Sequence, residues 1–162
     1  MPASRGPWFY IATFFGAGLF PRAPGTMGSL ASLLLWAPLV MYSAPWWVRA
    51  AVVVVVFALG VIASAHVVRT EGREDPQKIV IDEVAGMGIA LLLAPPTWFS
   101  VVVGFALFRL FDIWKPWPVR WADRRIHGGL GVMLDDALAG FYALGCLLLV
   151  LHFAVPAFAR SP

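Results

Sequence analysis

Three long runs without a charged side chain limit what this chain can fold into. Ala50–Val68 contains 19 residues without Asp, Glu, Lys or Arg, Val84–Phe108 contains 25, and Ala137–Ala159 contains 23. About 20 apolar residues in a helix cross the roughly 30 Å of hydrocarbon in a bilayer. We therefore expect helices that span a membrane.

The composition agrees with a membrane protein. Hydrophobic residues make up 60% of the 162 and charged residues 13%, with a mean hydropathy of +0.81, whereas soluble domains have about 25% charged residues. The net charge of +3 reflects a shortage of acids. In a membrane protein, basic residues report topology and lipid contact, so we expect no nucleic acid partner. The lone Cys146 excludes a disulfide framework and a Cys-based metal site.

Prolines and short apolar runs set the expected helix boundaries. Trp8–Phe20 is too short to span and is interpreted as an interfacial or re-entrant helix. It leads into a Gly/Pro-rich loop, so we expect no cleavable signal peptide. Pro95 and Pro96 cannot donate backbone N–H groups and should split the longest uncharged run into a hairpin. The later helices are expected at Leu30–Ser43, Ala50–Val68, Ile79–Ala94, Thr97–Trp114 and Ala137–Ala159.

The expected fold class is all-α. We predict a single domain, residues 1–162, forming a polytopic membrane helical bundle of about four to five membrane helices plus the N-terminal helix. With the N-terminus inside, five crossings leave only Arg49 and Arg160 of the twelve bases outside, in agreement with the positive-inside rule. All nine acids then lie inside as well, which that rule does not require. We expect the polar chemistry at the cytoplasmic ends of the helices.

Carboxylates stand at three of the predicted helix ends. One stretch, Phe108–Gly140, holds five of the twelve bases and four of the nine acids. An acidic pair at a helix start is often only a cap that complements the helix dipole. Asp112 lies near a C-terminal helix end, where Arg109 and Lys115, three residues to either side, offer a local ion-pair network as the structural alternative.

Taken together, these carboxylates predict a metal site. At one membrane face they would repel strongly without a cation among them, and hard oxygen ligands suit Mg²⁺. Asp135 and Asp136 point about 100° apart on a helix, so one can face a metal and the other a second partner. Small residues nearby permit close helix packing: Ala85, Gly86, Gly88, Ala137, Ala139 and Gly140. The candidate metal and catalytic residues are Asp82, Glu83, Asp112, Asp135 and Asp136.

Basic and glycine-rich segments predict contacts to a phosphate. Arg109 and Lys115 are the leading donors. The loop Gly16–Ser29 adds further candidates because the next helix N-terminus favours an anion: Arg22, Gly25 and Thr26. The alternative is a simple connecting loop in which Thr26 or Ser29 caps that helix.

The remaining polar residues of the charged stretch rank lower. Asp123 is interpreted as a solvated loop charge or an ion-pair partner, and His127, in a flexible Gly-rich turn, as a candidate general acid. Arg120, Arg124 and Arg125 either donate to phosphate or serve only attraction to the inner leaflet.

A metal with phosphate donors at a membrane surface indicates phosphoryl transfer on a lipid headgroup. Cys146 lacks the Arg spacing of a Cys-dependent phosphatase, and no DxDx stretch supports an aspartyl-phosphate route. Metal-assisted attack by water, or as second choice by a carboxylate, remains. The rival function is a small cation or proton transporter, because acids near membrane helices often mark ion pathways. A third alternative is a non-catalytic lipid-binding scaffold.

The residues also resemble a known family, phosphatidylglycerophosphatase A, a bacterial membrane lipid phosphatase. The resemblance covers about Thr13 to Ala143 in three blocks. They are Gly16…Pro24-Gly25-Thr26-Met-Gly28-Ser29, then Ile81-Asp82-Glu83-Val-Ala-Gly86, then Phe108-Arg109…Asp112…Lys115-Pro116…Asp123…His127-Gly128-Gly129…Asp135-Asp136…Ala139-Gly140.

That resemblance implies an integral membrane enzyme of the bacterial cytoplasmic (inner) membrane that uses Mg²⁺. It would hydrolyse phosphatidylglycerophosphate to phosphatidylglycerol and inorganic phosphate at a site facing the cytoplasm. The resemblance also implies that the five carboxylates Asp82, Glu83, Asp112, Asp135 and Asp136 are the leading site residues. It leaves open which acid binds the metal, which activates water, and the oligomeric state.

Overall fold

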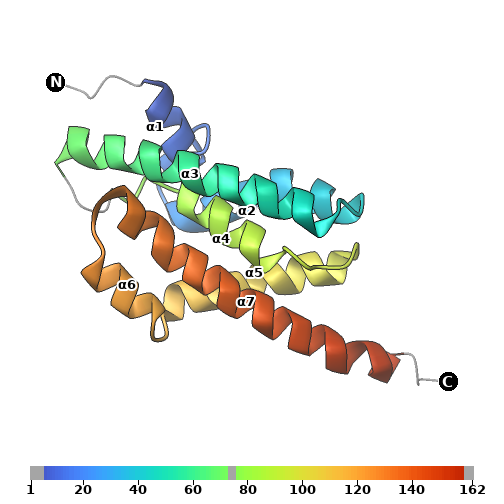
Figure 1. Ribbon diagram of the computed structural model, residues 1–162. Coiled ribbons are helices and arrows are strands. Elements are labelled where there is room, and N and C mark those ends of the chain that lie inside the picture. Colours follow the sequence, from blue (N-terminus) through green and yellow to red (C-terminus); the bar gives the residue numbers. More distant parts are fainter. Residues whose placement is uncertain (1–5, 73–75, 159–162) are drawn as a thin grey trace.

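The computed structural model describes residues 6–72 and 76–158, and within them every regular element is helical (Figure 1). The all-α class is therefore confirmed. The topology prediction also counted five charged residues that lie outside the described ones: Arg5, Arg73, Glu74, Asp75 and Arg160. The elements are α1 (Pro7–Ala12), the 3₁₀ helix η1 (Ala17–Leu19), α2 (Pro24–Met41), α3 (Trp46–Glu71), α4 (Ile81–Ala90), α5 (Trp98–Trp114), α6 (Val119–Arg125) and α7 (Gly128–Phe158).

Three described helices are long and apolar enough to cross a membrane: α2, α3 and the Gly128–Phe153 part of α7. The chain is a membrane protein. Helix α5 has 17 residues, but α4 has only ten, which corresponds to about 15 Å at 1.5 Å per residue. The predicted hairpin at Pro95 and Pro96 is present between α4 and α5, although its first arm covers only about half of a bilayer.

The long helices alternate in direction, so that their polar ends gather at one end of the bundle (Figure 1). The N-termini of α2, α4 and α7 lie there together with the C-termini of α3 and α5. We call this the polar end. Short α6 lies at the same end and packs against α7.

At the opposite end, Arg49 satisfies the backbone where α4 stops. Its side chain is 6% exposed. One guanidinium nitrogen, Nη1, donates to the carbonyls of Leu91, Leu92 and Ala94 at 3.2, 3.3 and 2.8 Å. Because lipid cannot satisfy the carbonyls at a helix end, this arginine allows α4 to end within the bundle.

Helix α2 begins six residues earlier than predicted, at Pro24 instead of Leu30. Proline is well suited to the first helical position because its missing N–H has no partner there anyway. Thr26 and Ser29 therefore lie inside the helix, and the prediction that one of them caps it is wrong. Ala23 occupies the N-cap position without a side-chain hydrogen bond.

Helix α7 also begins earlier than predicted, at Gly128 instead of Ala137. Asp135 and Asp136 consequently lie two turns inside the helix, so they cannot be caps that complement the dipole at its start. The intervening α6, which separates α5 from α7, was not predicted. Helix α4 ends at Ala90, earlier than the predicted Ala94, because residues 91–93 form a turn.

Glycines allow α4 and α7 to cross with their backbones in contact. A Cβ atom at Gly140 would collide with the Gly86 carbonyl oxygen, and one at Gly86 would lie 2.6 Å from the carbonyl oxygen of Asp136. The close packing expected from the small residues is confirmed at this crossing. On the other side of α4, the Trp36 indole of α2 donates to the Val84 carbonyl at 2.8 Å. The crossing therefore fixes the depth and rotation of α4.

This crossing makes a prediction about two glycines. Gly86→Ala should destabilise the protein by about 1–3 kcal/mol, because the added methyl meets backbone and the Phe108 ring. That cost exceeds or cancels the helix propensity of alanine, which by itself would stabilise the helix by roughly 1 kcal/mol relative to glycine. Gly145→Ala, with nothing within 4 Å of its Cβ position, is the matched control and should be neutral or stabilising. Thermal unfolding in detergent measures both, and equal midpoints would contradict the crossing.

Candidate active site

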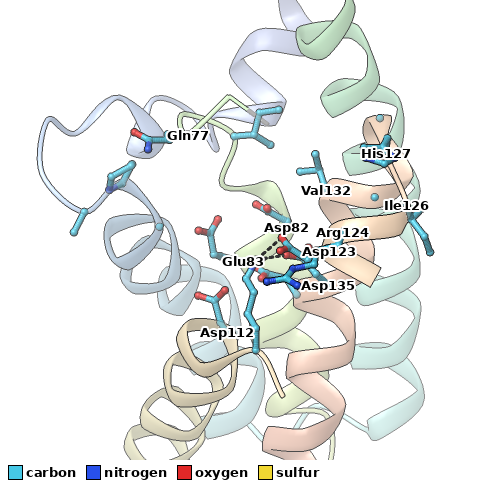
Figure 2. Close-up of a pocket in the computed structure, with 18 of the residues that line it drawn as sticks. Gln77, Asp82, Glu83, Asp112, Asp123, Arg124, Ile126, His127, Val132 and Asp135 are labelled. Carbon is cyan, nitrogen blue, oxygen red and sulfur yellow. Dashed lines mark hydrogen bonds and ion pairs between the residues drawn. The ribbon is translucent and has the colours of Figure 1, made fainter. Parts of the chain in front are cut away.

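A pocket of about 650 Å³ opens at the polar end between α2, α4, α5, α6 and α7. Figure 2 shows Asp82, Glu83, Asp112 and Asp135 around the same space. The structure thus brings all five predicted carboxylates to one pocket. Its charged and titratable lining residues are Asp82, Glu83, Asp112, Lys115, Asp123, Arg124, His127, Asp135 and Asp136.

Three of the carboxylates form a tight cluster. Asp82, Glu83 and Asp136 each offer an oxygen, and these oxygens lie within 4.8 Å of one another. Asp82 and Glu83 are one turn before Gly86, and Asp136 is one turn before Gly140, so the glycine crossing creates the cluster. Two unit charges at that separation repel by about 3.5 kcal/mol at an effective dielectric constant of about 20.

No described base forms an ion pair with the cluster, although the charge of Arg109 lowers the pKa of Glu83 in part. Glu83 and Asp136 are 8% and 4% exposed, and among the described residues Asp82 Oδ1 and Glu83 Oε2 have no hydrogen-bond partner. Burial, followed by the neighbouring Glu83 carboxylate, raises the pKa of Asp82 well above its ordinary value. Burial and the Asp136 charge raise the pKa of Glu83 to about 8. Oxygen ligands with these properties fit a hard divalent cation such as Mg²⁺.

Asp112 has its own cationic partner. Its Oδ2 accepts a hydrogen bond from Arg109 Nη1, one turn earlier on α5. Arg109 also reaches Ser29 Oγ at 3.3 Å and Thr26 Oγ1 at 3.4 Å, both on α2. Arg109 therefore ties α5 to α2 behind Asp112. Neither Arg109 nor Thr26, both predicted to bind phosphate, lines the pocket itself.

Lys115, at the C-cap of α5, lies between two other carboxylates. Its Nζ donates to Asp123 Oδ1 at 2.6 Å and to Asp135 Oδ2 at 2.8 Å. The expected pairing of Asp112 is thus confirmed for Arg109 and wrong for Lys115. Burial lowers the pKa of Lys115, but the hydrogen bonds to Asp123 and Asp135 outweigh it and raise the pKa overall. Asp135 Oδ1 has no hydrogen-bond partner among the described residues.

The glycine-rich segment contributes less than predicted. Arg22 is exposed and does not line the pocket, whereas Gly25 does. His127 and Asp123 line the pocket, although both ranked low in the sequence. Arg124 and Gln77 also line the pocket. The sequence offered Arg124 only as one of three arginines that donate to phosphate or attract the inner leaflet, and it offered no role for Gln77. Arg124 resembled the other arginines of its segment, and nothing in the sequence distinguishes Gln77.

Comparison with known proteins identifies the family. The profile of phosphatidylglycerophosphatase A matches residues 10–151. The chain belongs to this family. It is therefore a member of a phosphatase family, and the resemblance noted in the sequence is confirmed.

Individual relatives cover most of the chain. Phosphatidylglycerophosphatase A of Escherichia coli K12 is 43% identical over 147 residues, 90% of this chain and 84% of the relative. The same-named protein of Haemophilus influenzae is 38% identical, over 85% of each chain. A Bacteroides thetaiotaomicron protein named "Putative phosphatidylinositol-3-phosphatase" is 42% identical, over 82% and 86% of the two chains. No solved structure matches this chain significantly.

Gly25 offers a test of the site that leaves every charged residue in place. A Cβ atom at position 25 would collide with Glu83 Oε1, the far end of a flexible side chain. Gly25→Ala should therefore turn Glu83 out of the cluster while the fold persists, and lower the rate of phosphate release by roughly tenfold or more. Gly145→Ala should leave the rate unchanged. A fully active Gly25→Ala enzyme would contradict the expected displacement of a functional Glu83.

Proposed function

We propose that this chain hydrolyses phosphatidylglycerophosphate to phosphatidylglycerol and inorganic phosphate, with Mg²⁺ held by Asp82, Glu83 and Asp136. The observation that carries the proposal is this cluster of one half-buried and two buried carboxylates, in which two oxygens lack a partner among the described residues. It lies in a pocket that also contains a lysine and an arginine, in a chain of the phosphatidylglycerophosphatase A family.

The pocket divides its charges between a metal and a phosphate. When bound, Mg²⁺ would neutralise the cluster and polarise phosphate oxygens. Lys115 and Arg124 are the cations that line the pocket, so they donate to the oxygens of the terminal phosphate. Outside the cluster, Asp112 is half-buried and paired with Arg109, whereas Asp135 is buried and keeps one oxygen without a partner among the described residues.

Asp135 is our candidate for the general base. Lys115 holds its Oδ2, while its Oδ1 has no partner among the described residues and is available for a water proton. In the reaction, the water oxygen bonds to phosphorus and its proton passes to Asp135. The bond between phosphorus and the terminal glycerol oxygen breaks, and that oxygen takes a proton from solvent to become the hydroxyl group of phosphatidylglycerol. Asp135 returns its proton to solvent, which balances the reaction.

We further propose that the enzyme lies in the bacterial cytoplasmic membrane with its polar end facing the cytoplasm. Support comes from the basic residues, since ten of the twelve fall on that side in the predicted topology. The same arrangement disfavours the transporter alternative, which requires acids along the membrane depth. The five pocket carboxylates instead gather at one end of the bundle.

Metal removal tests the cluster directly. Phosphate release from phosphatidylglycerophosphate in nonionic detergent micelles should require Mg²⁺ and stop in EDTA. Mg²⁺ should also raise the unfolding temperature of the wild-type protein, because a cation offsets repulsion within the cluster. Asp136→Asn should lose both the Mg²⁺-dependent phosphate release and the Mg²⁺-induced rise in unfolding temperature. Asp123→Asn, outside the cluster, should keep that rise in unfolding temperature. Full activity in EDTA would refute the metal-dependent mechanism.

The assignment of Asp135 predicts a different defect. Asp135→Asn should lower kcat by about 10²–10⁴-fold, the usual contribution of a general base. The variant should retain the Mg²⁺-induced rise in unfolding temperature, because Asp135 lies outside the cluster. Loss of that rise in Asp135→Asn would instead make this residue a metal ligand.

A panel containing phosphatidate and phosphatidylinositol 3-phosphate measures the selectivity of the wild type.

A further inference from the structure

A second pocket adjoins the first at the polar end. It has a volume of about 620 Å³ and none of its lining residues is acidic. Lys115 and Arg124 line both pockets, so they form a shared wall between them. The lining residues are Trp114, Lys115, Pro116, Trp117, Arg120, Trp121, Arg124 and Arg125. We call this the arginine–tryptophan pocket.

The three arginines of this pocket are available to an anion. Within the described part of the chain, Arg120, Arg124 and Arg125 form no ion pair with a carboxylate. Arg120 Nη2 makes a long hydrogen bond of 3.4 Å to the Trp114 carbonyl. Arginine suits phosphate groups because its planar guanidinium can donate two parallel hydrogen bonds. A pocket that collects three arginines without an acid thus favours a phosphate group.

The aromatic residues indicate the depth of the pocket in the membrane. Trp114, Trp117 and Trp121 are 60%, 77% and 50% exposed. Exposed tryptophans in membrane proteins concentrate at the level of the lipid headgroups. The turn that carries Trp117 is held in place, because the Tyr142 hydroxyl of α7 donates to the Trp117 carbonyl at 2.8 Å. The pocket is therefore a fixed feature at headgroup level.

We propose that the arginine–tryptophan pocket binds the phosphodiester of the substrate lipid while the terminal phosphate occupies the carboxylate pocket. This inference rests on the proposed function. Phosphatidylglycerophosphate carries a phosphodiester and a phosphomonoester separated by the three carbons of a glycerol. Two groups so linked need two adjacent sites, and the shared wall of Lys115 and Arg124 provides that adjacency.

Such a site would determine specificity. Phosphatidate has a phosphomonoester but no phosphodiester, so it could fill the carboxylate pocket but not the second one. General attraction of basic residues to an anionic leaflet is the competing explanation for these arginines. That attraction needs neither a pocket nor a particular anionic group, and this difference separates the two explanations experimentally.

The first arm of the test uses the two arginines that line only the second pocket. The variant Arg120→Gln/Arg125→Gln leaves the carboxylate pocket intact. In neutral nonionic micelles, its KM for phosphatidylglycerophosphate should rise roughly tenfold or more, while kcat stays within about twofold of the wild-type value. Arg69→Gln, an exposed base in the last turn of α3, is the matched control and should change neither. An unchanged KM in the double variant would overturn the proposal.

The second arm uses two inhibitors in the same micelles. Phosphatidylglycerol keeps the phosphodiester and should inhibit the wild type competitively, whereas oleate is anionic but has no phosphodiester. The double variant should lose inhibition by phosphatidylglycerol and respond to oleate as the wild type does. Equal loss for both lipids would show simple charge attraction, and non-competitive inhibition would show a separate lipid site. Either result overturns the proposal.

A third measurement separates this inference from the proposed function. If the wild type does not hydrolyse phosphatidylglycerophosphate, the function fails, but equilibrium binding of phosphatidylglycerol to the protein still tests the pocket. Binding weakened by roughly tenfold in Arg120→Gln/Arg125→Gln, with unfolding temperature and Arg69→Gln binding unchanged, supports the pocket. Unweakened binding overturns it.

Discussion

The mutual repulsion of buried carboxylates is the constraint on which the rest of this structure depends. Asp82, Glu83 and Asp136 come within 4.8 Å of one another, and isolated helices carrying these charges would separate. The backbone contact between Gly86 and Gly140 holds α4 and α7 together against this repulsion. Side chains elsewhere on the two helices pack only if the glycines touch. Under the proposed function, a bound divalent cation would offset this repulsion.

The other distinctive interactions of the bundle keep α4 in its place. Trp36 holds its middle through the Val84 carbonyl, and Arg49 binds the carbonyls beyond its C-terminus. Helix α4 is only about 15 Å long, so it has little surface of its own to resist being displaced along the membrane normal. A buried arginine at one end therefore complements a carboxylate cluster at the other, and the two ends together set the depth of Asp82 and Glu83.

The sequence was sufficient to predict the membrane class, the hairpin at Pro95 and Pro96, and the carboxylates that meet. Composition and proline chemistry determine the first two locally, whereas the meeting of the carboxylates followed from the predicted topology. The prediction from the sequence misplaced the starts of α2 and α7, because Pro24 and Gly128 are compatible with both a loop and a first helical turn. The residues themselves do not decide between those two states.

The ion-pair partners of the carboxylates were harder to predict than the fact that the carboxylates lie close together. Asp112 has Arg109 and Lys115 at equivalent helical spacings, and local geometry alone gives both the same chance of pairing. The helix ends at Trp114, however, and the backbone of Lys115 turns to a φ of 47°. That turn directs Lys115 toward Asp123 and Asp135, which belong to elements that follow it in the chain. The choice of partner is thus made where regular helix geometry stops.

Adjacent positions on α7 give Asp135 and Asp136 separate environments. Neighbouring residues on a helix point about 100° apart, so a single helix can direct one carboxylate to each side. Asp136 faces α4 and joins the carboxylate cluster, whereas Asp135 faces the end of α5 and accepts a hydrogen bond from Lys115. A charged partner for one and a crowded cluster for the other make the two acids chemically different, although the sequence presents them as a pair. Metal binding and proton transfer can therefore be divided between consecutive residues without any further element of the fold.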